Sequence, residues 1–312
     1  MANGTKYLSL SLIALPSFFF ILRFLASFPL PPVPVAVYPS LASLPRSSRS
    51  WKIYPEDFYE GGNYVSFPFG RVRYWVFGPE TGEKIVLVHG LSVPAIIWKD
   101  VAPQLAAKGF RVLVYDLYGR GYSDAPCMSY SVGLYTTQLA LLMQHVRWDK
   151  AHIAALSMIA LIASTGLMEA SDLSRTSKVM SSPLVQYVAS SKPFRFLIQR
   201  LGSGDPSPNP LHEIVQIQSA YLPGYNYAIA SSLRDGPLRG LRSSFATLAT
   251  LDNELMLIWG TDDKTVPYRY ASYIQDIVPK SALLTVKGGS HDLTVSHPDI
   301  VAETLINFFT SK

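Results

Sequence analysis

The sequence has a single cysteine, Cys127, among its 312 residues, so no disulfide can form within the chain. It also lacks the cysteine pairs of structural zinc sites, and its six histidines show no H-E-x-x-H spacing. These absences argue against a metal enzyme. The one N-x-S/T sequence begins at Asn3, at the extreme N-terminus, so the main part of the chain offers no N-glycosylation site.

Acidic residues are absent from residues 1–52, a segment that contains five basic residues. Of the 27 basic residues, 22 therefore lie in the rest of the chain and match its 22 acidic residues. The positive excess lies beside an apolar segment. The charge distribution therefore argues against nucleic-acid binding.

Charge is also scarce between Tyr7 and Leu30, where Arg23 interrupts an otherwise apolar segment. About 20 residues suffice to span a bilayer, so residues 7–30 predict a single-pass membrane anchor. A cleaved signal peptide, which would give a secreted protein, and an interfacial apolar arm are the alternatives. More positive charge follows the segment than precedes it, which favours a cytosolic main domain. The proline-rich residues 31–55 predict a stiff linker.

Short apolar runs then alternate with segments of helical periodicity. This alternation predicts an α/β domain over residues 56–312, with a mostly parallel sheet flanked by helices. Residues from about 170 to 250 break the alternation and predict a helical cap insertion. The predicted strands are 71–77, 85–88, 111–115, 152–156, 255–259 and 283–286, and the predicted helices outside the cap are 95–108, 134–146 and 300–309.

Five short motifs follow one another in the main domain. They are LVHGLSVPAIIW at 87–98, DLYGRGYSD at 116–124, LSM around Ser157, IWGTDDKTVP at 258–267 and GGSHDL at 288–293. In this order, each after a predicted strand or loop, they resemble the α/β-hydrolase fold. The resemblance is to its cap-bearing branch of esterases, carbon–carbon hydrolases, epoxide hydrolases and dehalogenases, and it covers about residues 64–309.

The resemblance implies a Ser-His-Asp catalytic triad. A serine hydroxyl is a weak nucleophile until a neighbouring base accepts its proton. Ser157 is the expected nucleophile and His291 the expected base, in the chain order Ser, Asp, His of this fold. Asp263 is the expected acid that orients His291, because it lies three residues after Gly260. Asp262 is the alternative.

The same resemblance implies an oxyanion hole formed by the backbone N–H groups of Leu91 and Met158. It implies no metal or organic cofactor. Serine at position 157 argues against the dehalogenase and epoxide hydrolase chemistries, for which the family uses aspartate there. The expected substrate is a small, apolar molecule with an ester or a related acyl or carbon–carbon bond.

The helix that follows the nucleophile in this fold is missing from the sequence. Residues 159–166, IALIASTG, resemble the next parallel strand, but only Ser157 and Met158 separate them from the strand at 152–156. A parallel crossover needs about a dozen residues, so about twenty residues appear to be absent. Either residues 159–170 form a substitute helix, and the sheet loses a strand or recruits 178–180 instead, or they stay a strand and the nucleophile turn is lost. The second hypothesis is therefore a catalytically impaired hydrolase-fold protein that binds a ligand or partner, or a mis-spliced form.

Overall fold

The structure is a computed structural model. It describes residues 17–21, 23–24, 35–156, 161–163, 165–169, 171–201, 207–252 and 254–311. The chain divides into two compact units, residues 1–35 and 36–312. In the first unit, residues 17–21 and 23–24 are helical, and most of the predicted membrane segment at 7–30 lies outside the described residues. Within the described ranges, no helix is both long and apolar enough to cross a membrane.

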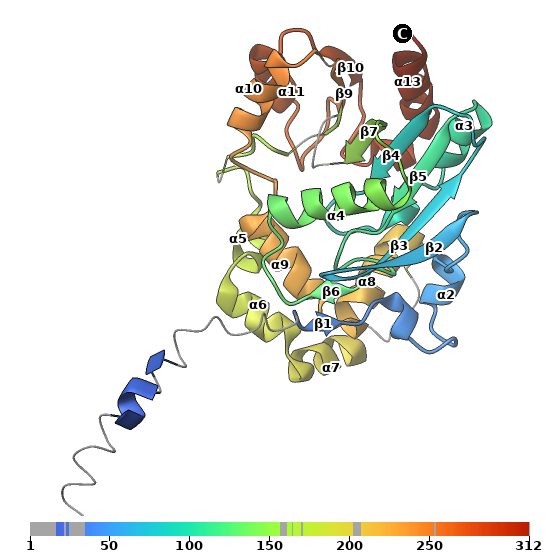
Figure 1. The fold of residues 1–312 in the computed structure, drawn as a ribbon. Coiled ribbons are helices and arrows are strands. Elements are labelled where there is room, and N and C mark those ends of the chain that lie inside the picture. The colour runs from blue at the N-terminus through green and yellow to red at the C-terminus, as the bar shows by residue number, and fades with distance from the viewer. Residues whose placement is uncertain are drawn as a thin grey trace, which may run out of the picture. The chain divides into compact units, whose positions relative to one another are not determined.

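An eight-stranded sheet forms the centre of the second unit (Figure 1), in the order β10-β9-β8-β7-β4-β5-β3-β2. Its strands are β2 (Gly62–Phe67), β3 (Gly70–Phe77), β4 (Lys84–Val88), β5 (Arg111–Tyr115), β7 (His152–Leu156), β8 (Leu161–Ile162), β9 (Met256–Gly260) and β10 (Ala282–Val286). The strands from β10 to β5 are parallel, whereas β3 and β2 are antiparallel to their neighbours. The prediction of a mostly parallel sheet is confirmed. A separate two-stranded sheet pairs β1 (Val37–Tyr38) with β6 (Ala125–Pro126).

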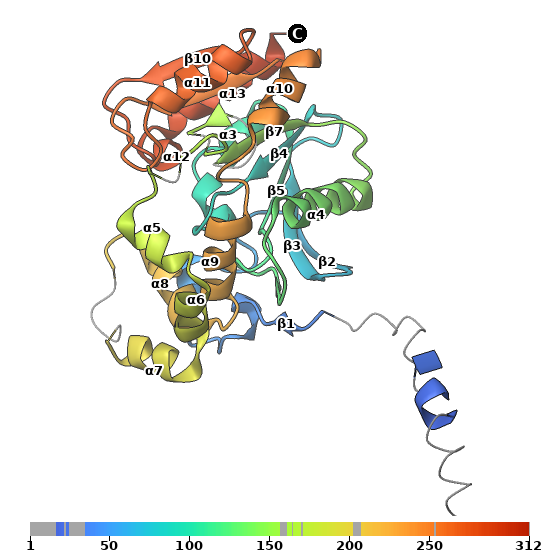
Figure 2. The ribbon, with the colours of Figure 1, turned by 90° about the vertical axis from the view of Figure 1, so that its left-hand side faces the viewer.

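Helices cover both faces of the sheet (Figure 2). Successive strand residues point to opposite faces, so Leu87 packs with α3 and α13, whereas Val88 packs with α4. The helices outside the cap are η1 (Leu41–Ser43), α2 (Ser50–Ile53), η2 (Ala95–Trp98), α3 (Ala102–Ala107), α4 (Val132–His145), α11 (Arg269–Ile277), α12 (Leu293–Ser296) and α13 (Pro298–Thr310).

The single helix predicted at 95–108 is wrong, because η2 and α3 are separate elements. Pro103 lies in the first turn of α3. Proline is favourable there but would clash with the carbonyl of residue 99 inside one continuous helix.

Residues 171–252 contain the helices predicted for the cap. They are α5 (Arg175–Met180), α6 (Pro183–Ser190), α7 (Lys192–Leu201), α8 (Pro210–Tyr221), α9 (Tyr225–Asp235) and α10 (Arg242–Thr250). Residues 178–180 lie in α5, so their recruitment as a strand is wrong. The second half of the proline-rich segment 31–55 packs onto the domain, because Leu41 and Tyr54 are fully buried.

The segment after β7 forms strand β8 and no substitute helix in its described residues, 161–163 and 165–169. Strand β8 is parallel to β7 and pairs only with its last two residues, Ala155 and Leu156. On its other side β8 pairs with β9 through Ile162. The predicted substitute helix at 159–170 is therefore wrong, and four residues, 157–160, connect two neighbouring parallel strands.

Candidate active site

The structure brings Asp263 and His291 together at the carboxyl ends of β9 and β10. His291 Nδ1 lies 2.9 Å from Asp263 Oδ2, and the Asp263 side chain is fully buried. The other carboxylate oxygen accepts hydrogen bonds from the backbone N–H groups of Thr265 and Val266, at 2.8 Å each. Because an ionised carboxylate only accepts hydrogen bonds, the His291 proton lies on Nδ1. Its Nε2 is then the basic atom, on a side chain that is 34% exposed.

The glycine-containing turns after β9 and β10 pack closely together, and this packing positions Asp263 and His291. A Cβ atom on Gly260 would lie 2.1 Å from the carbonyl oxygen of Gly289. That carbonyl accepts a hydrogen bond of 2.9 Å from the backbone N–H of Asp262. The side chain of Asp262 is exposed and accepts a hydrogen bond from Thr261. Of the two candidate acids, the structure therefore places Asp263 against His291 and turns Asp262 to solvent.

The predicted nucleophile Ser157 and the predicted oxyanion donor Met158 lie outside the described residues, which stop at Leu156 and resume at Leu161. The other predicted donor, Leu91, is half-buried in the loop after β4. Its backbone N–H remains a predicted oxyanion ligand.

His89, two residues before Leu91, is a structural residue of this loop. Burial is the main cause that lowers its pKa to about 3, so the imidazole is neutral. Its Nε2 accepts a 2.9 Å hydrogen bond from the backbone N–H of Leu117, and its Nδ1 donates to the carbonyl of Gly90 at 2.8 Å. The ring therefore joins the loop after β4 to the loop after β5.

Asp116 explains the second glycine, Gly121, of the D-x-x-G-x-G motif. Its buried carboxylate accepts hydrogen bonds from the Tyr54 hydroxyl and from the backbone N–H groups of Ala95 and Tyr122. A Cβ atom on Gly121 would lie 2.1 Å from Asp116 Oδ2, so only glycine fits. Burial outweighs the hydrogen bonds and raises the pKa of Asp116 to about 6.

Arg120 is a site residue that sequence reasoning missed. Its side chain is 1% exposed, and its guanidinium donates to the carbonyls of Leu91 and Tyr118 and to the hydroxyls of Tyr135 and Ser232, at 2.6–2.9 Å. None of these partners carries a negative charge. Ser232 belongs to cap helix α9, so Arg120 connects the loop after β4 to the cap. The only feature of the sequence that could have indicated this role is the position of Arg120 between two glycines of a turn, Gly119 and Gly121.

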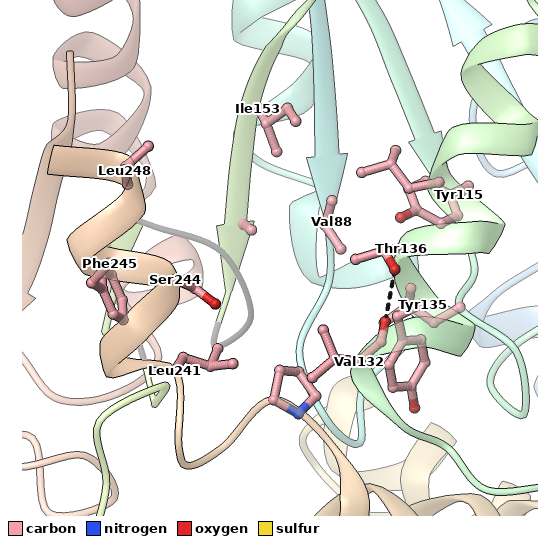
Figure 3. A pocket seen from close by; sticks show the side chains of 14 residues that line it. Val88, Tyr115, Val132, Tyr135, Thr136, Ile153, Leu241, Ser244, Phe245 and Leu248 are labelled. Atoms are coloured by element: carbon pink, nitrogen blue, oxygen red, sulfur yellow. Dashed lines mark hydrogen bonds between the residues drawn. The ribbon is translucent and has the colours of Figure 1, made fainter. Parts of the chain in front are cut away.

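A cavity of about 250 Å³ lies away from this pair, between α4 and α10 (Figure 3). Val88 and Ile153 line it from the sheet, and Leu241 and Phe245 line it beside and within α10. Neither Asp263 nor His291 is among its lining residues, so the cavity does not include this pair.

Comparisons with known proteins agree with this fold. The chain is 29% identical over 252 residues to a pimeloyl-[acyl-carrier protein] methyl ester esterase of Edwardsiella ictaluri, across 72% of this chain and 92% of that protein. A haloalkane dehalogenase of Mycobacterium marinum is 38% identical over 84 residues, which are 27% of this chain and 26% of the dehalogenase. The solved carboxylesterase of Bacillus subtilis has a similar fold, with a TM-score of 0.64 at 15% identity over 85% of this chain and 95% of the esterase.

The alpha/beta hydrolase family model matches residues 85–304, a range that contains the loop after β4, Asp263 and His291. The match covers more than half of the chain and includes the parallel strands from β4 to β10 and the cap, whereas β2 and β3 precede it. The protein therefore belongs to the alpha/beta hydrolase family.

Proposed function

We propose that the protein is a serine hydrolase that cleaves an ester or a related acyl or carbon–carbon bond. The observation that carries this proposal is the pair formed by Asp263 and His291. Two backbone N–H groups and His291 fix the buried carboxylate, which holds the imidazole with Nδ1 toward the acid. Such an orienting acid is what a general-base histidine requires.

In the proposed reaction, Ser157 Oγ attacks the substrate carbonyl carbon while His291 Nε2 accepts the hydroxyl proton. The backbone N–H groups of Leu91 and Met158 stabilise the oxyanion that forms. His291 then gives the proton to the leaving group as the bond to the carbonyl carbon breaks and an acyl-enzyme remains. Water, deprotonated by His291, releases the acid and restores Ser157.

The surface of the cap supports an apolar substrate at a membrane. Leu184, Tyr187 and Phe196 on α6 and α7 are between 56% and 78% exposed. Residues 173–201 include five basic residues and no acidic one. A basic, apolar surface is typical of proteins that lie on anionic lipid surfaces. Together with the apolar residues 7–30, this favours a membrane-attached enzyme whose main domain is cytosolic.

The second candidate is a hydrolase-fold protein with impaired catalysis that binds a ligand or partner. The four-residue connection between β7 and β8 favours it, because no crossover helix follows the predicted nucleophile in so short a segment. The positive end of a helix dipole is then unavailable to the oxyanion.

Labelling with a fluorophosphonate separates the two candidates. Active serine hydrolases form a covalent bond to this reagent, so we expect the full chain to be labelled and the Ser157→Ala variant to be unlabelled. The matched control is Ser290→Ala, because Ser290 is an exposed serine next to His291 and should not affect labelling. A folded chain that is not labelled would refute the hydrolase proposal and favour the binding protein.

A further inference from the structure

Side chains, and not a backbone ladder, hold the loop after β4. Within the described part of the chain, residues 90–93 make no backbone–backbone hydrogen bond. Instead, three successive carbonyl groups each accept a hydrogen bond from a side chain that is at most 3% exposed. The bonds join His89 Nδ1 to the Gly90 carbonyl at 2.8 Å, Arg120 Nε to the Leu91 carbonyl at 2.8 Å, and the Tyr225 hydroxyl to the Ser92 carbonyl at 2.9 Å.

Each of these bonds fixes the orientation of a whole peptide group. A peptide is planar and trans, so its carbonyl and its N–H point in opposite directions. The Gly90 carbonyl shares its peptide with the N–H of Leu91, the predicted oxyanion donor, so His89 fixes the direction of that N–H. Arg120 and Tyr225 fix the two peptides that follow, and so they restrain the backbone angles on the C-terminal side of this N–H.

Two of the three bonds depend on the cap. Tyr225 is the first residue of α9, and burial raises its pKa, so the hydroxyl stays protonated and donates. Arg120 lies outside the cap, but its guanidinium also donates to Ser232 Oγ of α9 at 2.8 Å. Gln218 of α8 holds the turn of Arg120, because its side-chain oxygen accepts a 2.7 Å hydrogen bond from the backbone N–H of Gly121. The cap therefore reaches the loop directly through Tyr225 and indirectly through Arg120.

We propose that Tyr225 and Arg120 are positioning residues, through which the cap holds the Leu91 N–H in place for the oxyanion. The inference rests on the proposed hydrolase function, because it concerns a step of that reaction. Donors stabilise an oxyanion best at about 2.7–3.1 Å, and a misplacement of about 1 Å can lower a rate about 100-fold. Each of the two residues acts through the carbonyl that it holds. A shift of the cap therefore changes the rate of the reaction as well as access to the site.

The first test measures fluorophosphonate labelling of the full chain at several reagent concentrations. This separates the maximal rate constant of labelling, kinact, from the reagent concentration at half of that rate, KI. Tyr225→Phe removes only the hydroxyl, and Ser232→Ala removes the cap acceptor of Arg120. We expect each change to lower kinact about tenfold, and the double variant to lower it further, while KI changes less than about twofold.

The matched control is Tyr59→Phe. Tyr59 is also buried, and its hydroxyl donates to the carbonyl of Ala95 at 2.9 Å, outside residues 90–93. Loss of this bond should lower the Tm about as much as Tyr225→Phe does, but it should leave kinact unchanged. Equal kinact values for the wild type, Tyr225→Phe and Ser232→Ala would overturn the inference.

NMR relaxation of the backbone amides tests the hold on the loop without any activity. We expect the order parameters of the Leu91 and Ser92 amides to be about 0.85 in the wild type and to fall toward about 0.6 in the double variant, while those of β4 stay constant. Unchanged order parameters contradict the inference, whatever the labelling shows. A folded wild type that is not labelled refutes the hydrolase function itself, whereas a labelled wild type with equally labelled variants refutes only the positioning role.

Discussion

The buried imidazole of His89 makes the folded state sensitive to acid. Burial lowers its folded-state pKa from 6.5 to about 3, so the unfolded chain binds a proton over a pH range in which the folded protein does not. Acidification below about pH 6.5 therefore favours unfolding. The contribution is about 1.4 kcal/mol per pH unit, or about 2 kcal/mol between pH 6.5 and pH 5.

Urea unfolding at several pH values, followed by tryptophan fluorescence, measures this effect in the wild type and in a His89→Gln variant. Glutamine retains a donor and an acceptor but does not titrate. The free energy of unfolding of the wild type minus that of the variant should decrease by about 2 kcal/mol from pH 6.5 to pH 5. Asp116, whose raised pKa of about 6 acts in the opposite direction, is present in both proteins and cancels in the difference. A difference that stays constant over this range would refute the assignment of His89 as a neutral buried residue.

Three further predictions concern the site. Asp263→Asn should lower the rate of fluorophosphonate labelling by about 10³-fold or more, because the amide no longer fixes the tautomer of His291, whereas Asp262→Asn should label like the wild type. Arg120→Lys keeps the charge but cannot reach four acceptors, so we expect a loss of about 2–4 kcal/mol in the free energy of unfolding, and an unchanged stability would show that the network is dispensable. Gly260→Ala should lower the Tm and slow labelling, because the added Cβ would lie 2.1 Å from a backbone carbonyl of the loop that carries His291. Labelling at the normal rate would mean that this loop moves freely.

The sequence by itself determined the parts of the fold that follow local rules. Apolar runs of four or five residues predicted the central strands, because burial on both faces leaves a continuous local signal. The resemblance of the motifs at 258–267 and 288–293 to the α/β-hydrolase fold implied that Asp263 and His291 form a pair, and the structure joins them at 2.9 Å. The missing crossover could also be recognised, because a minimum connection length is a rule about chain length alone.

Only the tertiary structure decided how the remaining residues are used. The role of Arg120 depends on acceptors as distant in sequence as Leu91 and Ser232, which no local pattern connects. Tertiary contacts also decided whether the residues after β7 form a substitute helix or strand β8. Residues 161–162 have no decisive propensity over so short a length, and pairing with β7 and β9 fixes them as a strand. The cavity also exists only in the folded chain, because its lining comes from the sheet, α4 and α10, which are distant in sequence.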